Sequence, residues 1–178
     1  TFFKRRVIRL HPMVIMGSII GALFFFLQKS PCFPNMDNVS VGTVLIIMLY
    51  GCTLLPLPLK WDIRGWTEMH PLNGPAWSLY YEYIGNILYA LFVRKFNKVA
   101  LSILVFLAAC ATLHLCLTAP NGDIVGGWAL NWEQQYVGFV RLLYPFFAGL
   151  LLSRLGWLIR VKKRAFWWLS LIHISEPT

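Results

Sequence analysis

Residues 73–89 read NGPAWSLYYEYIGNILY, and both the fold and the function are best approached from this stretch. Asn73 and Gly74 have the chemistry of a turn, and Pro75 suits the first position of a helix, where its missing N–H is no loss. At about 100° per residue, the polar and small side chains that follow share one narrow face, and Leu and Ile cover the rest. This face consists of Ser78, Glu82, Gly85, Asn86 and Tyr89. In a membrane it is expected to turn toward protein or a wet cavity.

Glu82 is the candidate for chemistry within this stretch. A charged Glu at membrane depth costs roughly 2.5 kcal/mol or more unless it is solvated, paired or protonated. A carboxylate kept at such a cost can act as a general base or orient another residue that does. The alternative is that Glu82 lies at headgroup level near the helix start and caps backbone N–H groups.

The composition of the whole chain is that of a membrane protein. Of its 178 residues 58% are hydrophobic and only 13% are charged, with a mean hydropathy of +0.62. A soluble domain has about a quarter of its residues charged. We therefore expect an all-α, polytopic membrane helical bundle with about five apolar helices. The net charge of +9 comes from short basic clusters at the ends of apolar runs, which is typical of cytoplasmic loops and predicts no nucleic-acid partner.

The apolar runs predict where the helices lie. Spans are expected from the basic N-terminal cluster to about residue 28 and over residues 75–93, 99–117 and 136–157. Residues 40–59 are also apolar, but Gly51, Pro56 and Pro58 interrupt them, so a broken or re-entrant segment is expected. The charges agree, because the basic clusters put the start of the first span and the end of residues 75–93 on one cytoplasmic side.

Small residues within the apolar runs are expected to serve packing. Gly17 and Gly21 form a GxxxG pair, which allows a close approach inside the bundle. The four cysteines show neither a CxxC pair nor a metal-ligand spacing, so we expect no disulfide framework and no metal. They are Cys32, Cys52, Cys110 and Cys116.

Cations form the second candidate site. Lys4, Arg5, Arg6 and Arg9 precede the first span, and paired guanidiniums bind phosphates in a bidentate manner. A coenzyme A or lipid phosphate fits such a cluster, although positive-inside anchoring explains it without any site. Arg141, one turn into the last span, either snorkels outward or lines a cavity, and the outward orientation is slightly favoured.

Both ends of the sequence look cut. It starts at Thr1, directly before the basic cluster, and residues 169–178 read LSLIHISEPT, which resembles the translated end of a sequencing adapter. We therefore expect residues 1–168 to be a partial membrane domain and residues 169–178 to be a non-native tail.

Two motifs resemble those of membrane-bound acyltransferase family 3. The first is Arg5-Arg6-x-x-Arg9-x-x-Pro12, and the second runs from Leu72 to Trp77-Ser78-Leu79-x-x-Glu82. The resemblance covers roughly residues 2–165. It implies a multi-pass enzyme of the cell inner membrane that moves an acyl group, commonly acetyl, to a hydroxyl of a glycan or similar acceptor. The donor would be cytoplasmic acyl-CoA, a co-substrate, with no bound cofactor.

The resemblance also implies roles for individual residues. Arg5, Arg6 and Arg9 would bind the phosphates of coenzyme A. Glu82 and Ser78 would be catalytic, and the substrate cavity would include Trp77, Asn86 and Tyr89. Asn86 stands where the family motif carries an aromatic residue. The family's catalytic His lies upstream of the arginine motif, before Thr1, so that role is not transferred to His11, and the fragment is expected to be inactive alone.

A membrane transporter or flippase of a lipid-linked or anionic solute is the alternative. Broken helices and a carboxylate at the midplane suit transport as well as catalysis. A pseudo-repeat of the Glu82 helix would favour the transporter, whereas a His one helix before Lys4 would favour the enzyme.

Overall fold

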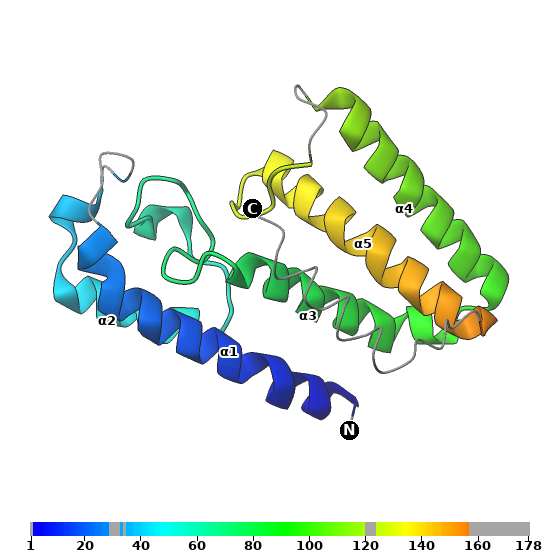
Figure 1. Cartoon of the computed structure of the whole chain (residues 1–178), viewed down its shortest axis with the longest axis horizontal. Helices are drawn as coiled ribbons and strands as arrows, with labels where there is room; N and C mark the ends of the chain where they lie inside the picture. The colour runs from blue at the N-terminus through cyan, green and yellow to red at the C-terminus, as the bar shows by residue number, and fades with distance from the viewer. Residues whose placement is uncertain (1, 29–32, 34, 120–123, 157–178) are drawn as a thin grey trace, which may run out of the picture.

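The computed structural model describes residues 2–28, 33, 35–119 and 124–156. These described residues form five α-helices, whose arrangement Figure 1 shows. They are α1 (Phe2–Phe24), α2 (Val41–Gly51), α3 (Ala76–Leu91), α4 (Lys98–Thr118) and α5 (Trp132–Leu155). No strand occurs in the described ranges, where the isolated bridge between Glu68 and Ala129 joins two loops. The prediction of an all-α bundle with about five helices is confirmed.

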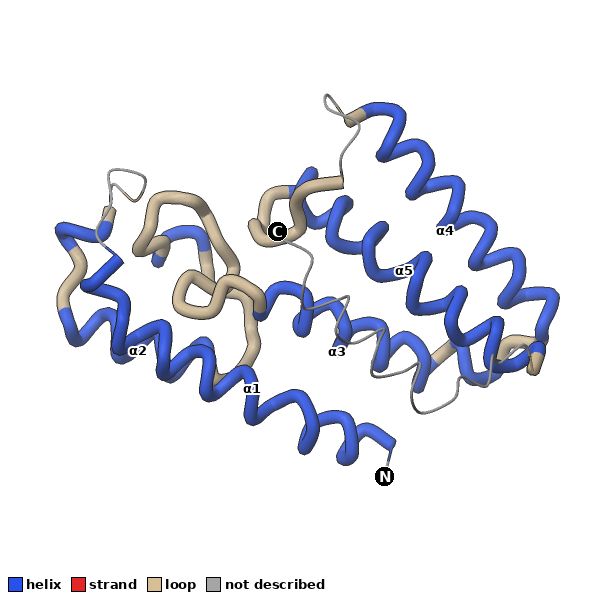
Figure 2. Tube along the Cα trace, in the orientation of Figure 1, coloured by secondary structure: helices blue, strands red, loops and turns tan. Residues whose placement is uncertain are grey.

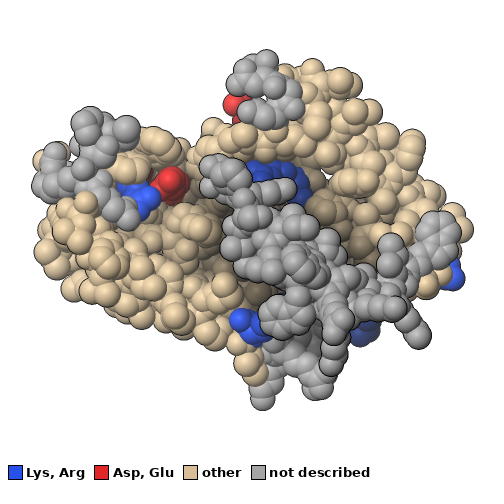
Figure 3. Space-filling model, in the orientation of Figure 1, with Lys and Arg blue, Asp and Glu red and all other residues tan. Residues whose placement is uncertain are grey.

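Among the described residues, three helical segments are long and apolar enough to cross a membrane. They are Val7–Leu27, α4 and α5. Figure 3 shows few charged side chains among the described atoms on the face that it displays, which suits contact with lipid. The chain is therefore a multi-pass membrane protein.

The helix α2 is too short to span. Its 11 residues extend for about 16 Å at 1.5 Å per residue, roughly half of the hydrocarbon core. Ser40 caps its start by accepting a hydrogen bond from the backbone N–H of Thr43 at 3.2 Å. The helix ends before Pro56, as the prediction of a broken segment required.

The helix α5 begins four residues earlier than the sequence predicts. The polar residues at its start are helical because their side chains bind the loop that precedes them. Gln134 accepts a hydrogen bond from the backbone N–H of Gly127 at 2.7 Å, and Gln135 donates one to the carbonyl oxygen of Ala129 at 2.9 Å. The predicted start at residue 136 was wrong, because hydropathy gives no weight to such local hydrogen bonds.

The helices form two packed groups (Figures 1 and 2). The helix α4 packs antiparallel to α5, and α3 lies along α5, while α1 packs on α2 and contacts α3. The connector between α2 and α3 meets the loop before α5 at one end of the bundle, where the N–H of Met69 donates to the carbonyl oxygen of Trp128 at 2.7 Å. The helix α3 starts at this end of the bundle. The basic residues Arg94, Lys95 and Lys98 follow the C-terminal end of α3. The charge distribution thus agrees with the predicted orientation.

The GxxxG pair of α1 packs against the turn that precedes α3. A Cβ atom on Gly21 would overlap the carbonyl oxygen of Leu72, and one on Gly17 would overlap the side chain of Asn73. The Asn73 amide also donates to the carbonyl oxygen of Val14 at 3.4 Å. This contact within the chain fixes the position at which α3 starts.

Candidate functional site

An open cavity of about 440 Å³ lies between α3 and α5. Its size is in the range of small-molecule sites. Residues from both helices line it, namely Trp77, Ser78, Tyr81 and Glu82 from α3 and Gly138, Arg141, Leu142, Pro145 and Phe146 from α5. The structure thus brings together three of the predicted site residues, Trp77, Ser78 and Glu82.

Glu82 and Ser78 lie one turn apart on the α3 wall of this cavity. The Ser78 hydroxyl donates to the carbonyl oxygen of Pro75 at 2.8 Å, which leaves its oxygen to accept a hydrogen bond. Glu82 is half-buried and stands six residues after Ala76, beyond the first turn of α3. The alternative that it caps the helix start therefore finds no support in the geometry.

Asn86 and Tyr89 lie farther along α3 and do not line the cavity. Asn86 is 1% exposed and donates from Nδ2 to the carbonyl oxygen of Glu82 at 2.8 Å. Its Oδ1 has no hydrogen-bond partner within the described ranges. Tyr89 packs against the buried cluster of Val93, Leu101 and Phe147. The predicted polar face is thus divided, because Asn86 is buried and Tyr89 packs into this cluster and not into the cavity, and a substrate role for the two residues stays a prediction.

Arg141 faces this cavity from α5. Its Nη1 donates to the carbonyl oxygen of Gly126 at 3.0 Å, and its guanidinium carbon lies 4.7 Å from the centroid of the Trp77 ring. A cation over a Trp face gains about 0.5–2 kcal/mol. Of the two predicted alternatives, the structure supports the one in which Arg141 lines a cavity, and its side chain is exposed there. The sequence shows a Trp in one helix and an Arg in another, which does not predict that the two side chains meet. Their contact depends on how α3 packs against α5.

Glycines let the walls of the cavity come close together. Gly127 has a φ of +105°, and a Cβ atom there would lie 3.1 Å from the Trp77 ring. At Gly138 a Cβ atom would overlap the ring of Tyr81, which is 2% exposed. The Tyr81 hydroxyl has no hydrogen-bond partner among the described residues, so it is a polar group at the cavity wall that the sequence analysis missed.

The N-terminal cations do not belong to this cavity. Arg9 is exposed on α1. The side chains of Arg5 and Arg6 lie outside the described residues, although their backbone is part of α1. Their role in binding phosphate stays a prediction. The tail at residues 169–178 is likewise outside the described residues.

The connector before α3 is held by buried polar groups. His70 is 5% exposed, its Nε2 lies 3.3 Å from the carbonyl oxygen of Leu54, and burial lowers its pKa. Burial raises the pKa of Glu68, which Arg64 partly offsets at 3.4 Å. These side chains fix the loop in front of the site. Within the described ranges, no three His, Cys, Asp or Glu residues group closely enough to hold a metal ion.

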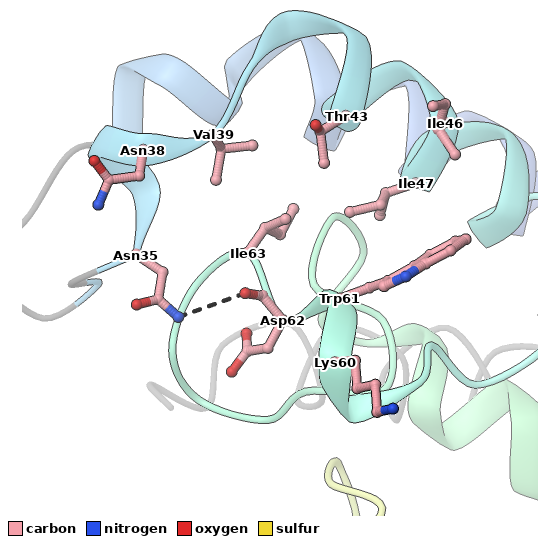
Figure 4. A pocket seen from close by; sticks show the side chains of 10 residues that line it. All are labelled: Asn35, Asn38, Val39, Thr43, Ile46, Ile47, Lys60, Trp61, Asp62 and Ile63. Carbon is pink, nitrogen blue, oxygen red and sulfur yellow. Dashed lines mark hydrogen bonds between the residues drawn. The ribbon is translucent and has the colours of Figure 1, made fainter.

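A second cavity of about 430 Å³ lies between α2 and the connector (Figure 4). Trp61 and Lys60 line one side of it, and Asn35 donates from Nδ2 to the carbonyl oxygen of Asp62 at 3.4 Å. The Asp62 carboxylate accepts hydrogen bonds from three backbone N–H groups of its own loop and so stabilises the conformation of that loop. The predicted site residues do not line this second cavity.

The sequence matches the model of a known protein family. The model of the acyltransferase domain of acyltransferase family 3 matches residues 1–174. Neither the curated proteins nor the solved structures include a significant match. Because the family model covers nearly the whole chain, and because three of its helical segments within the described residues can cross a membrane, this chain belongs to acyltransferase family 3, a family of membrane acyltransferases.

Proposed function

We propose that this protein is an O-acyltransferase of the cell inner membrane. It moves an acyl group, acetyl in the first instance, from acyl-CoA to a hydroxyl of a glycan or a similar acceptor. The family match supports acyl transfer over the transporter alternative. The observation that carries the proposal is the cavity between α3 and α5, which has Glu82 and Ser78 on its wall.

In the proposed reaction the acceptor oxygen attacks the thioester carbonyl carbon. The new C–O bond forms as the C–S bond breaks, and the proton of the hydroxyl leaves with the coenzyme A thiolate. Glu82 takes the hydroxyl proton itself or orients the base that takes it, and the base then gives the proton to the departing thiolate, which leaves as the thiol. The resemblance implies an upstream His as that base. Ser78 donates to the Pro75 carbonyl, so its oxygen is oriented to accept a hydrogen bond from the acceptor.

Arg5, Arg6 and Arg9 are proposed to bind the donor phosphates. They stand in the first turns of α1, and the positive-inside rule places them in the cytoplasm, where acyl-CoA is found. The acceptor would then reach the cavity from the opposite end, where the loops before α3 and α5 meet.

The test is acyl transfer from labelled acetyl-CoA by the full-length protein in membrane vesicles. Glu82→Gln keeps the size of the side chain and removes its charge, so transfer should fall by about 10²–10⁴-fold while membrane insertion is unchanged. Glu133→Gln, at an exposed position in the first turn of α5, is the matched control and should stay active. Full activity of Glu82→Gln would exclude Glu82 from the mechanism.

A further inference from the structure

We propose that Arg141 binds an anionic group of the acceptor, so that the acceptor is an acidic sugar or a phosphorylated one. The inference rests on the proposed function and adds the chemical class of its acceptor. It starts from the position of a guanidinium in the wall of the cavity that holds Glu82 and Ser78.

Arg141 is held in place by neutral partners. One N–H group donates to the Gly126 carbonyl oxygen at 3.0 Å, and the guanidinium lies over the Trp77 ring at 4.7 Å. Neither partner carries a negative charge, and within the described ranges Arg141 forms no ion pair. A guanidinium has five N–H donors, so further donors remain for a ligand.

A charge in this position calls for an anion. In membrane proteins, Arg side chains that face the interior or a water-filled cavity pair with other charges or with backbone carbonyls and mark substrate pathways. Arg141 has one such carbonyl partner and is exposed to the open cavity, where a ligand can reach it. A carboxylate or a phosphate matches the planar fork of a guanidinium and accepts two parallel hydrogen bonds. The Trp77 ring and the Gly126 carbonyl fix the plane of that fork in advance, which lowers the cost of ordering it when a ligand binds.

The distance of Arg141 from the two ends of the bundle indicates which substrate carries the anion that it binds. Arg141 lies about 14 Å along α5 from its start, and Glu82 lies about 9 Å along α3 from its start, at 1.5 Å per residue. Both starts adjoin the loops at one end of the bundle. Arg9 is roughly 22 Å of helix from the corresponding end of α1. The phosphates of the donor are proposed to lie with Arg9, so the anion at Arg141 belongs to the other substrate.

The experiment measures the binding of three sugars with the same ring to the full-length protein purified in detergent. Glucose is neutral, glucuronate carries a carboxylate and glucose 6-phosphate carries a phosphate. Binding is measured as the shift in melting temperature over a concentration series. At least one anionic sugar should bind about tenfold or more tightly than glucose, because hydrogen bonds to charged groups are the stronger ones. Whichever anion is preferred identifies the acidic group.

Variants locate the effect. Arg141→Gln should abolish the preference for the anion, and Arg141→Lys should retain part of it. Arg94→Gln removes the same charge at an exposed position near the other end of α3 and should leave the preference intact. Equal binding of all three sugars to the wild-type protein would overturn the inference even if Arg141→Gln did not fold. A preference that survives in Arg141→Gln would also overturn it.

The outcome is separable from that of the proposed function. Glu82→Gln should lose acyl transfer and keep the anion preference. A wild-type protein that transfers acetyl groups but binds glucose and glucuronate equally refutes only the acidic acceptor. A protein that prefers the anion but transfers no acyl group refutes the transferase.

Discussion

Arg154 donates a hydrogen bond from Nη2 to the carbonyl oxygen of Val93, 3.0 Å away. The same guanidinium also donates to the carbonyl oxygens of Phe96 and Arg94. These carbonyls belong to the 3₁₀ turn Val93–Lys95 that follows α3 and to the residue after it, and the Val93 carbonyl also accepts a hydrogen bond from the backbone N–H of Phe96. One side chain from the last turn of α5 thus binds the turn that follows α3 and links the two helices that form the walls of the cavity.

Replacing Arg154 should loosen this end of the bundle. Arg154→Met keeps much of the side chain's length but removes its donors, and a hydrogen bond from a charged group contributes about 1.5–3 kcal/mol. We expect a clear fall in the melting temperature of the full-length protein in detergent. Arg94→Met is the control. It removes a cation from the turn that Arg154 binds, but the backbone carbonyl at position 94 can still accept the hydrogen bond from Arg154. Equal melting temperatures for Arg154→Met and the wild type would show that the contact contributes nothing.

A methyl group at Gly21 should destabilise the bundle. The added Cβ would overlap the Leu72 carbonyl oxygen, and overpacking of this kind costs about 1–3 kcal/mol. Gly149→Ala in α5 is the matched control, because its Cβ would meet no atom within 4 Å. There the loss of glycine's chain freedom should stabilise the helix by about 0.5–1 kcal/mol. Thermal unfolding of both variants checks this pair, and a stable Gly21→Ala would place α1 elsewhere.

Acid should destabilise the loop at His70. Because burial lowers the pKa of His70 in the folded state, the unfolded state binds a proton more readily. Its contribution to stability is therefore complete above about pH 6.5 and is lost as the pH falls toward the folded pKa. His70→Gln should flatten the dependence of melting temperature on pH between about 5 and 7.5. Glu68 acts in the opposite direction, because its pKa is raised in the folded state. Its contribution to stability is complete below the ordinary pKa of Glu and is lost as the pH rises through the raised pKa, in the variant as in the wild type.

Local signals were sufficient for most of the helices. Apolar runs located α1, α3 and α4, and the prolines after Gly51 predicted the early end of α2. The start of α5 at Trp132 was missed because Gln134 and Gln135 are polar in sequence but bind a neighbouring loop in the fold.

The site was predictable only along α3. The spacing of Ser78 and Glu82 put them on one face of one helix, which helical periodicity alone determines. Arg141 belongs to a helix that packs on α3 because Gly138 lets Tyr81 approach, and no periodicity reports a contact between segments so far apart. Asn86 and Tyr89 share the predicted face, but Asn86 is buried and Tyr89 packs against residues of α4 and α5, and a contact of this kind cannot be predicted from the periodicity of α3.

The close packing of Gly21 against the Leu72 carbonyl couples the position of α1 to that of α3. Any piston movement of α1 along its own axis has to carry the turn at residues 72–73 and, with it, the first turn of the helix that bears Trp77 and Ser78. A shift of α1 would therefore act directly on the start of α3, through the Leu72 carbonyl and the Asn73 side chain.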